Sequence, residues 1–423
     1  MKPERFTAGV FVIVIAGMMV SSLGSFASGK VKHVADNTRR EIAIDWEKLY
    51  PFDGRRESAA REKISSFCQY VKGKLEDYTS KKLPGYYTLV ETAKKYEDAL
   101  SWNMVSMSEY NAVMRLKDDC LTTYTMSLDV AHDAESVKGL AGFCGERGID
   151  FVYINLPTKV CVSEDKEISG ILDFSNQNTD RLLAMLKESG VRCYDFREAL
   201  HSAGMDHHES FFITDHHWKP ETGLWAAGKV LEILRDDFGY DVDPEILRPE
   251  NFRYEVYPDW FLGSQGKKVT LARTKPEDFT MIYPKFGTAL KFDVPGLGLK
   301  LSGDFGITYN MNQVETKDYY GKNPYAAYIY ADNPLMRMEN MNVSNGRRLL
   351  IIHESMSNCV VPFAALGVQY VDSIDLRQFT GSVRNFVDTV RPDAVIVMYY
   401  STIPGRYANP LSAWEAKRMY SFQ

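Results

Sequence analysis

The sequence predicts an α/β protein: a parallel sheet flanked by helices, with a helical N-terminal region and a β-rich insertion. Apolar strands alternate with helices from about residue 131, and the alternation resumes near residue 347. Strands that are apolar throughout are typical of a parallel sheet covered by helices on both faces. The 423 residues are 45% hydrophobic and 13% aromatic, which is enough to bury a substantial core.

Residues 1–28 have the features of an export signal. Lys2 and Arg5 precede an apolar stretch without charge, and Ala27 ends a small-x-small cleavage pattern. The apolar stretch approaches the roughly 20 residues that span a bilayer, so a cleaved signal peptide and an uncleaved membrane anchor are both open. Either form predicts an extracytoplasmic protein, which is secreted or contacts the membrane through its N-terminal segment.

Residues 29–130 are predicted to form a helical N-terminal region. Apolar residues recur three or four positions apart in the segments RREIAIDWEKLY, AAREKISSFCQYVKGKLEDY and LVETAKKYEDALSW. Pro84 and Gly85 interrupt this region with a turn.

Residues 131–400 are predicted to form the α/β domain, and residues 401–423 a C-terminal tail. The first half of the domain alternates helix and strand, over 134–148 (helix), 149–156 (strand), 178–190 (helix), 191–196 (strand) and 220–239 (helix). The last of these helices starts near Pro220 and is strongly amphipathic. Its apolar stripe consists of Leu224, Ala227, Leu231 and Leu234.

The second half of the domain repeats this alternation. The predicted elements are 347–355 (strand), 356–367 (helix), 368–376 (strand), 380–393 (helix) and 394–400 (strand). Between the halves, residues 240–347 are rich in Tyr, Gly and Pro and contain short β-like pieces at 289–294 and 298–305. We interpret this stretch as an insertion that lies beside the sheet.

The charge and the cysteine content argue against two classes of protein, nucleic-acid-binding proteins and proteins with a cysteine-based zinc site. The 50 basic and 56 acidic residues give a net charge of −6 without a long basic run, which argues against a nucleic-acid-binding protein. The six cysteines show neither a CxxC motif nor a zinc-type Cys/His spacing. We interpret them as core residues or occasional disulfide partners, not as metal ligands.

Two polar clusters follow predicted strands, where ligands bind in open α/β sheets. One is Asp215-His216-His217-Trp218, and the other is His353-Glu354-Ser355. A serine becomes a nucleophile when a base removes its proton and an acid orients that base. Asp215 and His217 are two residues apart and project to the same side of an extended segment. We therefore expect Asp215 to hold His217, His217 to face Ser355, and His216 to point elsewhere.

Structural and metal-binding explanations compete with this catalytic one. Asp215 can cap a helix entry, and Ser355 can be a helix N-cap, which is compatible with catalysis because its backbone N–H would then help to bind an oxyanion. The sequence DHH occurs twice, at 206–208 and 215–217, and His201 lies nearby. Neither helical i, i+4 spacing nor a distant third ligand stands out, so we expect no metal site.

The segment TDHHW, followed by a helix and much later by a strand that ends in an acid-Ser pair, resembles the bacterial DHHW proteins. More distantly, it is similar to the SGNH-hydrolase-like domain of periplasmic alginate O-acetyltransferases, over roughly residues 130–400. The order Asp, His, Ser is that of the family, whereas ordinary SGNH hydrolases place the serine first. The resemblance implies an SGNH-hydrolase-like fold with Asp215, His217 and Ser355 as the catalytic triad.

The resemblance also suggests residues around the triad. LPTK at 156–159 looks like a family segment whose lysine, here Lys159, would contact substrate. FLGSQGKK at 261–268 resembles the segment that places an oxyanion donor, which implies Gly263 or Ser264. Asn333 is a candidate for the family's asparagine donor. Trp218 is expected either to pack beneath the His217 loop or to stack on a sugar.

One departure from the family is the residue before the serine. The family normally has an aspartate there, whereas this chain has Glu354, preceded by the bulky His353. The longer Glu354 can alter the turn, and His353 can compete for Ser355.

The expected function is that of an extracytoplasmic serine-dependent O-acyltransferase or esterase acting on O-acetyl groups of a cell-surface polysaccharide. No cofactor is required by this chemistry. A transferase needs an acyl donor at the outer face, and the resemblance implies a membrane-bound O-acyltransferase as that partner. The alternative is a catalytically silent glycan-binding or assembly protein with the same fold, for which Glu354 is the main support.

Overall fold

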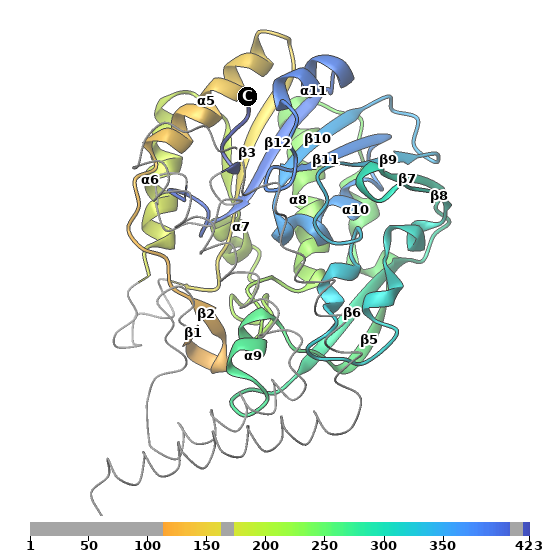
Figure 1. The fold of residues 1–423 in the computed structure, drawn as a ribbon. Helices are drawn as coiled ribbons and strands as arrows, with labels where there is room; N and C mark the ends of the chain where they lie inside the picture. Colours follow the sequence, from red (N-terminus) through yellow and green to blue (C-terminus); the bar gives the residue numbers. More distant parts are fainter. Residues whose placement is uncertain (1–112, 162–172, 407–417) are drawn as a thin grey trace, which may run out of the picture. The chain divides into compact units, whose positions relative to one another are not determined.

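The computed structural model describes residues 113–161, 173–406 and 418–423 (Figure 1). These residues belong to one compact unit, Lys94–Gln423. The predicted export signal over 1–28 and most of the predicted helical region over 29–130 lie outside the described residues, as does much of the predicted tail. Within the described ranges, no helix has the length and apolar character needed to cross a membrane.

An eight-stranded sheet forms the centre of the unit, with the strand order β4-β3-β12-β10-β11-β9-β7-β8. Its first five strands are parallel: β4 (Cys193–Asp195), β3 (Asp150–Leu156), β12 (Ala394–Tyr400), β10 (Arg348–His353) and β11 (Tyr370–Asp375). Its last three strands are antiparallel to their neighbours: β9 (Met336–Asn340), β7 (Leu290–Val294) and β8 (Leu299–Gly303).

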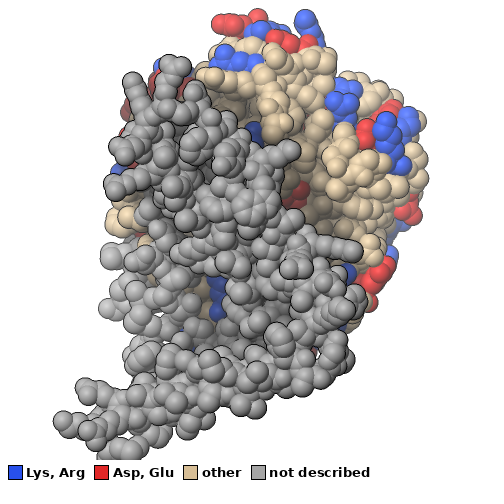
Figure 2. Space-filling model, in the orientation of Figure 1, with Lys and Arg blue, Asp and Glu red and all other residues tan. Residues whose placement is uncertain are grey.

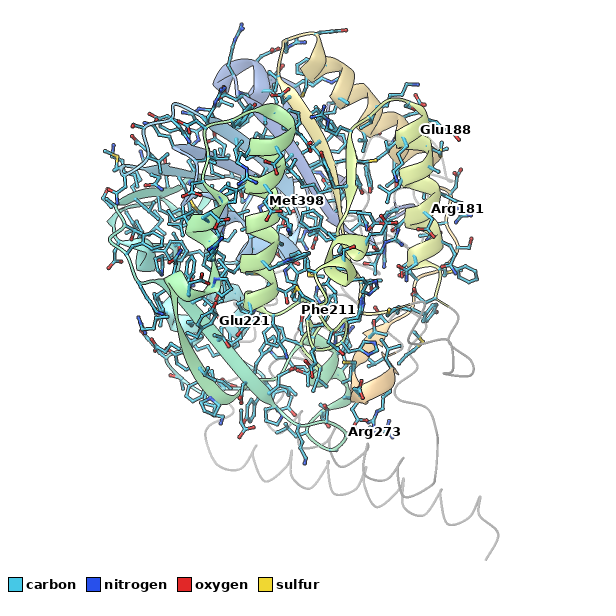
Figure 3. All side chains as sticks on the ribbon, turned by 180° about the vertical axis from the view of Figure 1, so that it is seen from behind. Arg181, Glu188, Phe211, Glu221, Arg273 and Met398 are labelled. Carbon is cyan, nitrogen blue, oxygen red and sulfur yellow. The ribbon has the colours of Figure 1, made fainter. Side chains whose placement is uncertain are left out.

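Helices cover both faces of the parallel strands, as predicted. Side chains of β3 alternate between two cores: Tyr153 packs with the helices of one face and Ile154 with those of the other. The first face carries α5 (Ala131–Gly145), α6 (Ser175–Glu188) and α11 (Val383–Val390). The second carries α8 (Pro220–Phe238) and α10 (Val361–Ala364), and α8 lies in front of the sheet when the molecule is seen from behind (Figure 3).

The remaining elements surround this core. Two short antiparallel pairs lie outside the main sheet: β1 (Val113–Arg115) with β2 (Leu121–Thr123), and β5 (Phe252–Phe261) with β6 (Glu277–Pro284). The short α-helices are α7 (Phe196–Ser202) and α9 (Ser264–Val269). The 3-10 helices are η2 (Lys117–Asp119), η4 (Pro244–Leu247), η5 (Pro249–Asn251), η6 (Pro295–Leu297), η7 (Phe305–Thr308), η8 (Met311–Gln313), η9 (Pro324–Ala327) and η10 (Ser355–Cys359).

Three predictions of local structure were wrong in part. The insertion over 240–347 does not simply lie beside the sheet, because β7, β8 and β9 extend it; Leu290, Phe292 and Val294 of β7 alternate inward and are buried. The helix predicted over 356–367 is a 3-10 turn followed by the four-residue α10 with Pro362. Residues 113–123, at the end of the predicted helical region, contain β1 and β2.

Acidic and basic side chains are interspersed on the described part of the surface that Figure 2 shows. No extended basic patch is visible on that part of the surface. This distribution fits the near-balanced composition of the chain, with 50 basic and 56 acidic residues.

Candidate active site

The segment from Phe211 to Trp218, which we call the histidine loop, forms a closed loop between α7 and α8. Phe211 and Trp218 form an antiparallel bridge, and the N–H of Phe212 donates to the carbonyl of His217 over 3.1 Å. Figure 3 shows Phe211 near the beginning of α8, which Glu221 marks. Helix α8 starts at Pro220, whose fixed φ suits the first turn of a helix. The loop therefore presents Asp215 and His217 from a fixed backbone.

Asp215, His217 and Ser355 form one continuous hydrogen-bonded chain. His217 Nδ1 lies 2.5 Å from Asp215 Oδ1, and His217 Nε2 lies 2.9 Å from Ser355 Oγ. All three residues are buried, with at most 8% of their surface exposed. A carboxylate accepts, so Nδ1 carries the proton and Nε2 is left to accept the hydroxyl proton of Ser355. The structure thus places the three predicted residues in the order that a serine nucleophile needs.

Asp215 is held in its ionised form. Burial would raise the pKa of Asp215, but the facing imidazoles of His216 and His217 outweigh burial. The hydrogen bonds from His217 and from the Ser264 N–H lower it further, so the pKa of Asp215 lies well below its usual range. Asp215 can therefore orient His217 and stabilise a positive charge on it.

His216 does not point away from Asp215, contrary to the prediction. Its Nδ1 lies 3.2 Å from Asp215 Oδ1 and 3.2 Å from Ser264 Oγ. Its ring centroid is 3.8 Å from that of His217. Desolvation, and after it the neighbouring His217, lower the pKa of His216, so this ring is neutral near pH 7. The loop bends, because Asp215 receives both the backbone N–H and the ring of His217, and an extended-strand alternation no longer applies.

The turn that carries Ser355 accommodates Glu354 without displacing the serine. Glu354 lies at the N-cap of η10, and its carboxylate accepts the N–H of Met356 over 2.8 Å. His353 does not compete for Ser355, because its Nε2 lies 2.7 Å from Ser373 Oγ and its Nδ1 lies 2.9 Å from the Glu354 carbonyl. Burial raises the pKa of Glu354 to about 8.

Two aromatic residues join the histidine loop to the serine turn. Trp218 Nε1 donates to the Met356 carbonyl over 2.7 Å, and the Tyr325 hydroxyl donates to the same carbonyl over 2.8 Å. The Tyr325 ring also stacks on His217, with centroids 3.9 Å apart and planes 20° apart. Trp218 is fully buried, which excludes sugar stacking and leaves the packing role. Tyr325 was not predicted, since only its place in a Tyr-rich stretch was visible in the sequence.

Gly263 and Ser264 support Asp215, and their backbone N–H groups are engaged away from Ser355. The N–H of Gly263 donates to Thr214 Oγ1 over 2.8 Å, and the N–H of Ser264 donates to Asp215 Oδ2. A Cβ at position 263 would lie 2.3 Å from the Cβ of Asp215, so only glycine fits there. In this structure neither backbone N–H points to an oxyanion at Ser355, because Thr214 accepts the first and the acid of the triad accepts the second.

Lys159 and Asn333 also have structural contacts in place of the predicted substrate contacts. Lys159 is buried, and its Nζ donates to the carbonyls of Leu121 and Ile213 over 2.7 and 2.9 Å. Desolvation lowers its pKa to about 8. The amide nitrogen of Asn333 faces three carbonyls of a turn with positive φ, those of Ile329, Tyr330 and Ala331.

Glu277 on β6 fixes the backbone just before Asp215. One carboxylate oxygen accepts the N–H of Ile213 and the other the N–H of Thr214, each over 2.7 Å. Together with Lys159, which binds the Ile213 carbonyl, it holds the loop from two sides. This residue was also missed, because nothing in the segment KPEDF around it relates it to the histidine loop.

Ser355 opens onto a cavity of about 420 Å³. Its other lining residues are His216, Asp332, Glu354, Arg377, Gln378, Tyr400, Ile403, Arg406 and Met419. Arg377 is paired with Asp332 and with Asp375, so part of this polar lining is fixed by ion pairs. The cavity can hold a small polar group beside the serine hydroxyl.

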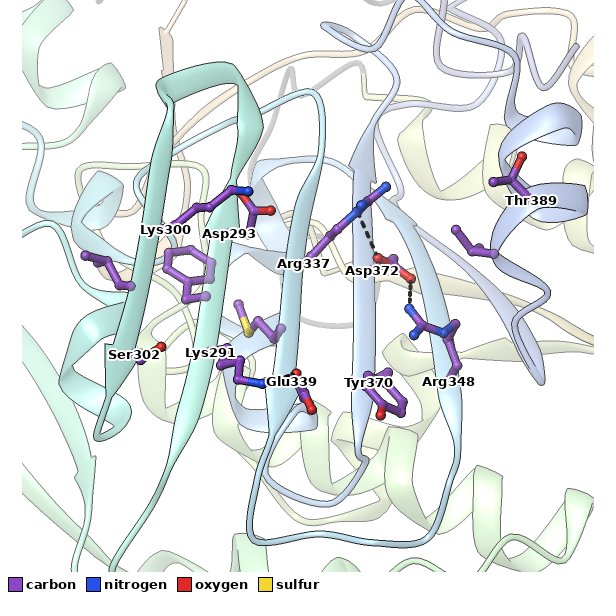
Figure 4. Close-up of a pocket in the computed structure, with 14 residues that line it drawn as sticks. Lys291, Asp293, Lys300, Ser302, Arg337, Glu339, Arg348, Tyr370, Asp372 and Thr389 are labelled. Atoms are coloured by element: carbon purple, nitrogen blue, oxygen red, sulfur yellow. Dashed lines mark hydrogen bonds and ion pairs between the residues drawn. The ribbon is translucent and has the colours of Figure 1, made fainter.

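A second hollow of about 660 Å³ lies over the sheet edge (Figure 4). Its charged groups pair with one another: Arg337 and Arg348 with Asp372, and Lys291 with Glu339. Arg348 begins β10, whereas Ser355 follows the other end of that strand. The hollow is therefore separate from the triad.

Two groups of side chains among the described residues could bring three metal-ligand atoms together. The first is Asp215, His216 and His217, but there both ring nitrogens of His217 already serve the triad. The second is Cys161, His201 and His207.

Comparison with known proteins shows which folds this chain is similar to. Residues 118–254 match the family model of the SGNH hydrolase-like domain of acetyltransferase AlgX. The structure of Bacillus cereus PatB1 with a sulfonyl adduct is similar at a TM-score of 0.59 and 17% identity, covering 74% of this chain and 99% of that one. A DHHW family protein from Eubacterium siraeum is similar at a TM-score of 0.52 and 15% identity, covering 75% and 96%. No curated protein sequence matches the chain.

The AlgX-type match includes Asp215 and His217, and the two structural likenesses extend the common fold over about three quarters of the chain. The predicted resemblance to DHHW proteins and to the AlgX domain is confirmed. The chain carries an SGNH hydrolase-like α/β domain, in which the serine follows the Asp-x-His pair in sequence.

Proposed function

We propose that the protein is an extracytoplasmic, serine-dependent O-acyltransferase or esterase that acts on O-acetyl groups of a cell-surface polysaccharide. The observation that carries the proposal is the chain of hydrogen bonds from Asp215 through His217 to Ser355 at the rim of a cavity. The AlgX family model that matches residues 118–254 describes an acetyltransferase, which supports acyl transfer.

The first half of the reaction forms an acyl-serine. Ser355 Oγ attacks the acyl carbonyl carbon while His217 Nε2 takes the hydroxyl proton. Asp215 stabilises the resulting imidazolium. Collapse of the tetrahedral intermediate breaks the bond to the leaving oxygen, and His217 returns its proton to that oxygen. The acetyl group is then bound to Ser355.

The second half decides between transfer and hydrolysis. A sugar hydroxyl that enters the cavity loses its proton to His217 and attacks the acyl-serine. The bond from the acyl carbon to Ser355 Oγ then breaks, and His217 returns the proton to Ser355, which leaves an O-acetylated glycan and the free serine. Water in the same place gives free acetate. Neither route requires a cofactor. For the transfer route we propose a membrane-bound O-acyltransferase as the supplier of the acyl group, which places the domain outside the cytoplasm.

Covalent labelling tests the nucleophile directly. Sulfonyl and fluorophosphonate reagents attach to activated serines, and a sulfonyl adduct has been captured in PatB1. We expect the full chain to be labelled once, and Ser355→Ala to lose both the label and the release of acetate from an O-acetylated glycan. Ser302→Ala, the same substitution at an exposed position of β8, is the matched control and should keep both.

Product analysis separates the two routes. With an acetyl donor and an unmodified glycan, a transferase increases the mass of the glycan by acetyl groups, whereas an esterase releases only acetate. If the wild type is not labelled, and acetate release is the same in Ser355→Ala, the enzyme proposal fails and the silent glycan-binding alternative replaces it.

A further inference from the structure

Three metal-binding side chains from separate segments meet outside the triad. Cys161 follows β3, His201 lies in the last turn of α7, and His207 lies in the turn that leads to the histidine loop. One ligand atom of each residue, Sγ or a ring nitrogen, lies within 4.8 Å of the other two. No local sequence pattern connects Cys161 to these histidines, because 39 residues separate it from His201.

The distances fit a tetrahedral site. His201 Nε2 lies 3.8 Å from Cys161 Sγ and 3.2 Å from His207 Nδ1. Around zinc, with bonds of about 2.3 Å to sulfur and 2.0–2.1 Å to nitrogen, tetrahedral angles place ligand atoms roughly 3.3–3.6 Å apart. Both distances therefore lie within a few tenths of an ångström of tetrahedral values, and the third pair, Cys161 Sγ and a His207 ring nitrogen, lies within 4.8 Å.

The outer ring nitrogen of His207 is fixed in the way that metal sites require. Its Nε2 lies 2.8 Å from the Thr158 carbonyl, which can only accept, so Nε2 carries the proton. The lone pair of neutral His207 then lies on Nδ1, which faces His201 and the shared space. A carbonyl that binds the outer nitrogen of a ligating histidine orients the ring and raises its basicity.

Burial leaves one side of the cluster open. Cys161 and His207 are buried, whereas His201 is exposed, so an ion can enter past His201 and keep water as a fourth ligand. One thiolate and two neutral imidazoles suit zinc and similar borderline-soft cations better than magnesium or calcium, which prefer oxygen ligands.

We propose that Cys161, His201 and His207 form a binding site for Zn²⁺ or a cation of the same class. The bound ion links the segment after β3, the end of α7 and the turn before the histidine loop. Lys159, two residues before Cys161, already binds the Ile213 carbonyl in that loop. The ion therefore stabilises the segments from which the triad is built, while Ser355 and His217 remain outside its coordination.

Metal loading of the full chain tests the site. After incubation with zinc chloride and removal of excess metal, we expect one equivalent of zinc per chain by elemental analysis. Cobalt in its place should give a thiolate-to-cobalt charge-transfer band in the wild type. Cys161→Ser should lose that band, and Cys161→Ser and His207→Asn should each bind zinc more weakly by roughly 100-fold or more, the upper range for losing even an outer-sphere partner.

Two control variants test whether the zinc binds at this cluster and not at another thiol or histidine. Cys193→Ser removes a thiol on β4, and His216→Ala removes a ligand atom of the other histidine cluster; both variants should keep the zinc and the cobalt band. A wild type without a cobalt–thiolate band, or zinc lost on His216→Ala but retained in Cys161→Ser, overturns the proposal. Because Ser355 labelling is measured separately, either proposal can fail without the other.

Discussion

Glu354, which stands before Ser355 where the family normally has an aspartate, still supports the turn that carries the serine. Glu354 is one methylene longer than aspartate, and it still caps the first turn of η10 by accepting the Met356 N–H. The Met356 carbonyl is held in turn by Trp218 and Tyr325. Ser355 is therefore positioned from both sides of its turn, which removes the main structural argument for a silent site.

Asp215→Asn tests whether Asp215 orients His217 in a protein that still folds. An asparagine can present its amide group to His217 and leave the imidazole in the wrong tautomer, so the proton no longer moves from Ser355. We expect kcat for acetyl-ester cleavage to fall by about 10³- to 10⁴-fold. Circular dichroism and the melting temperature should change little. A variant with wild-type kcat would show that Asp215 does not orient the base.

Two variants separate the contribution of the Tyr325 hydroxyl from that of its ring. Tyr325→Phe keeps the ring on His217 and removes the hydroxyl, which bonds the Met356 carbonyl and lies 3.2 Å from Cys359 Sγ. Trp218 still satisfies the Met356 carbonyl, so we expect a loss of about 1 kcal/mol in unfolding free energy. Tyr325→Ala leaves a buried cavity and should cost roughly 3–5 kcal/mol. Urea denaturation measures both changes, and the alanine variant should also lower kcat. Equal effects of the two variants would contradict a role for ring stacking.

At the scale of elements, the start of α9 acts as a support for the acid of the triad. Gly263 approaches Asp215 so closely that a methyl group at position 263 would lie 2.3 Å from its Cβ and 2.6 Å from the Thr214 carbonyl. Neither neighbour can withdraw freely, since Asp215 is bonded to His217 and Thr214 to Glu277.

Gly263→Ala should therefore displace Asp215 and lower kcat by roughly 100-fold, the order expected for a displacement of about 1 Å. Gly142→Ala is the matched control, because a Cβ there meets no atom within 4 Å and the residue lies inside α5. That change should leave kcat unaltered and raise stability by up to about 1 kcal/mol. Steady-state kinetics and thermal melting of the two variants measure these effects. Similar kcat values for Gly263→Ala and Gly142→Ala would contradict the role of Gly263 in supporting Asp215.

The elements also show what a sequence can predict. The parallel strands β3, β10, β11 and β12 were predicted because their apolar runs are local signals, and Asp215, His217 and Ser355 because polar residues follow strands. The pairing of β7 with β9 joins residues such as Leu290 and Asn340, which no local pattern connects. The same holds for the contact of Tyr325 with His217 and for that of Glu277 with Thr214, each of which joins residues more than 60 positions apart.

For the whole domain, buried acids set how stability depends on pH. Burial raises the pKa of Asp133 to about 7 and that of Glu354 to about 8. In the unfolded chain these groups ionise at their ordinary, lower pKa values. Between the two pKa values the folded protein holds more protons than the unfolded chain, so its stability falls as pH rises, from about 4.5 to 8 for Glu354.

Glu354→Gln tests this pH dependence, because glutamine keeps an acceptor for the Met356 N–H and cannot ionise. Near pH 5 position 354 is neutral in both folded proteins, so their unfolding free energies should differ by less than about 1 kcal/mol. Near pH 8.5 the wild type must bury a carboxylate, so the variant should be more stable by roughly a few kcal/mol, at about 1.4 kcal/mol per pKa unit. Glu146→Gln, at an exposed position, should show no such change between the two pH values. Urea denaturation at both pH values measures the difference in unfolding free energy between Glu354→Gln and the wild type. If that difference is the same at both pH values, Glu354 is already ionised in the folded domain at pH 5.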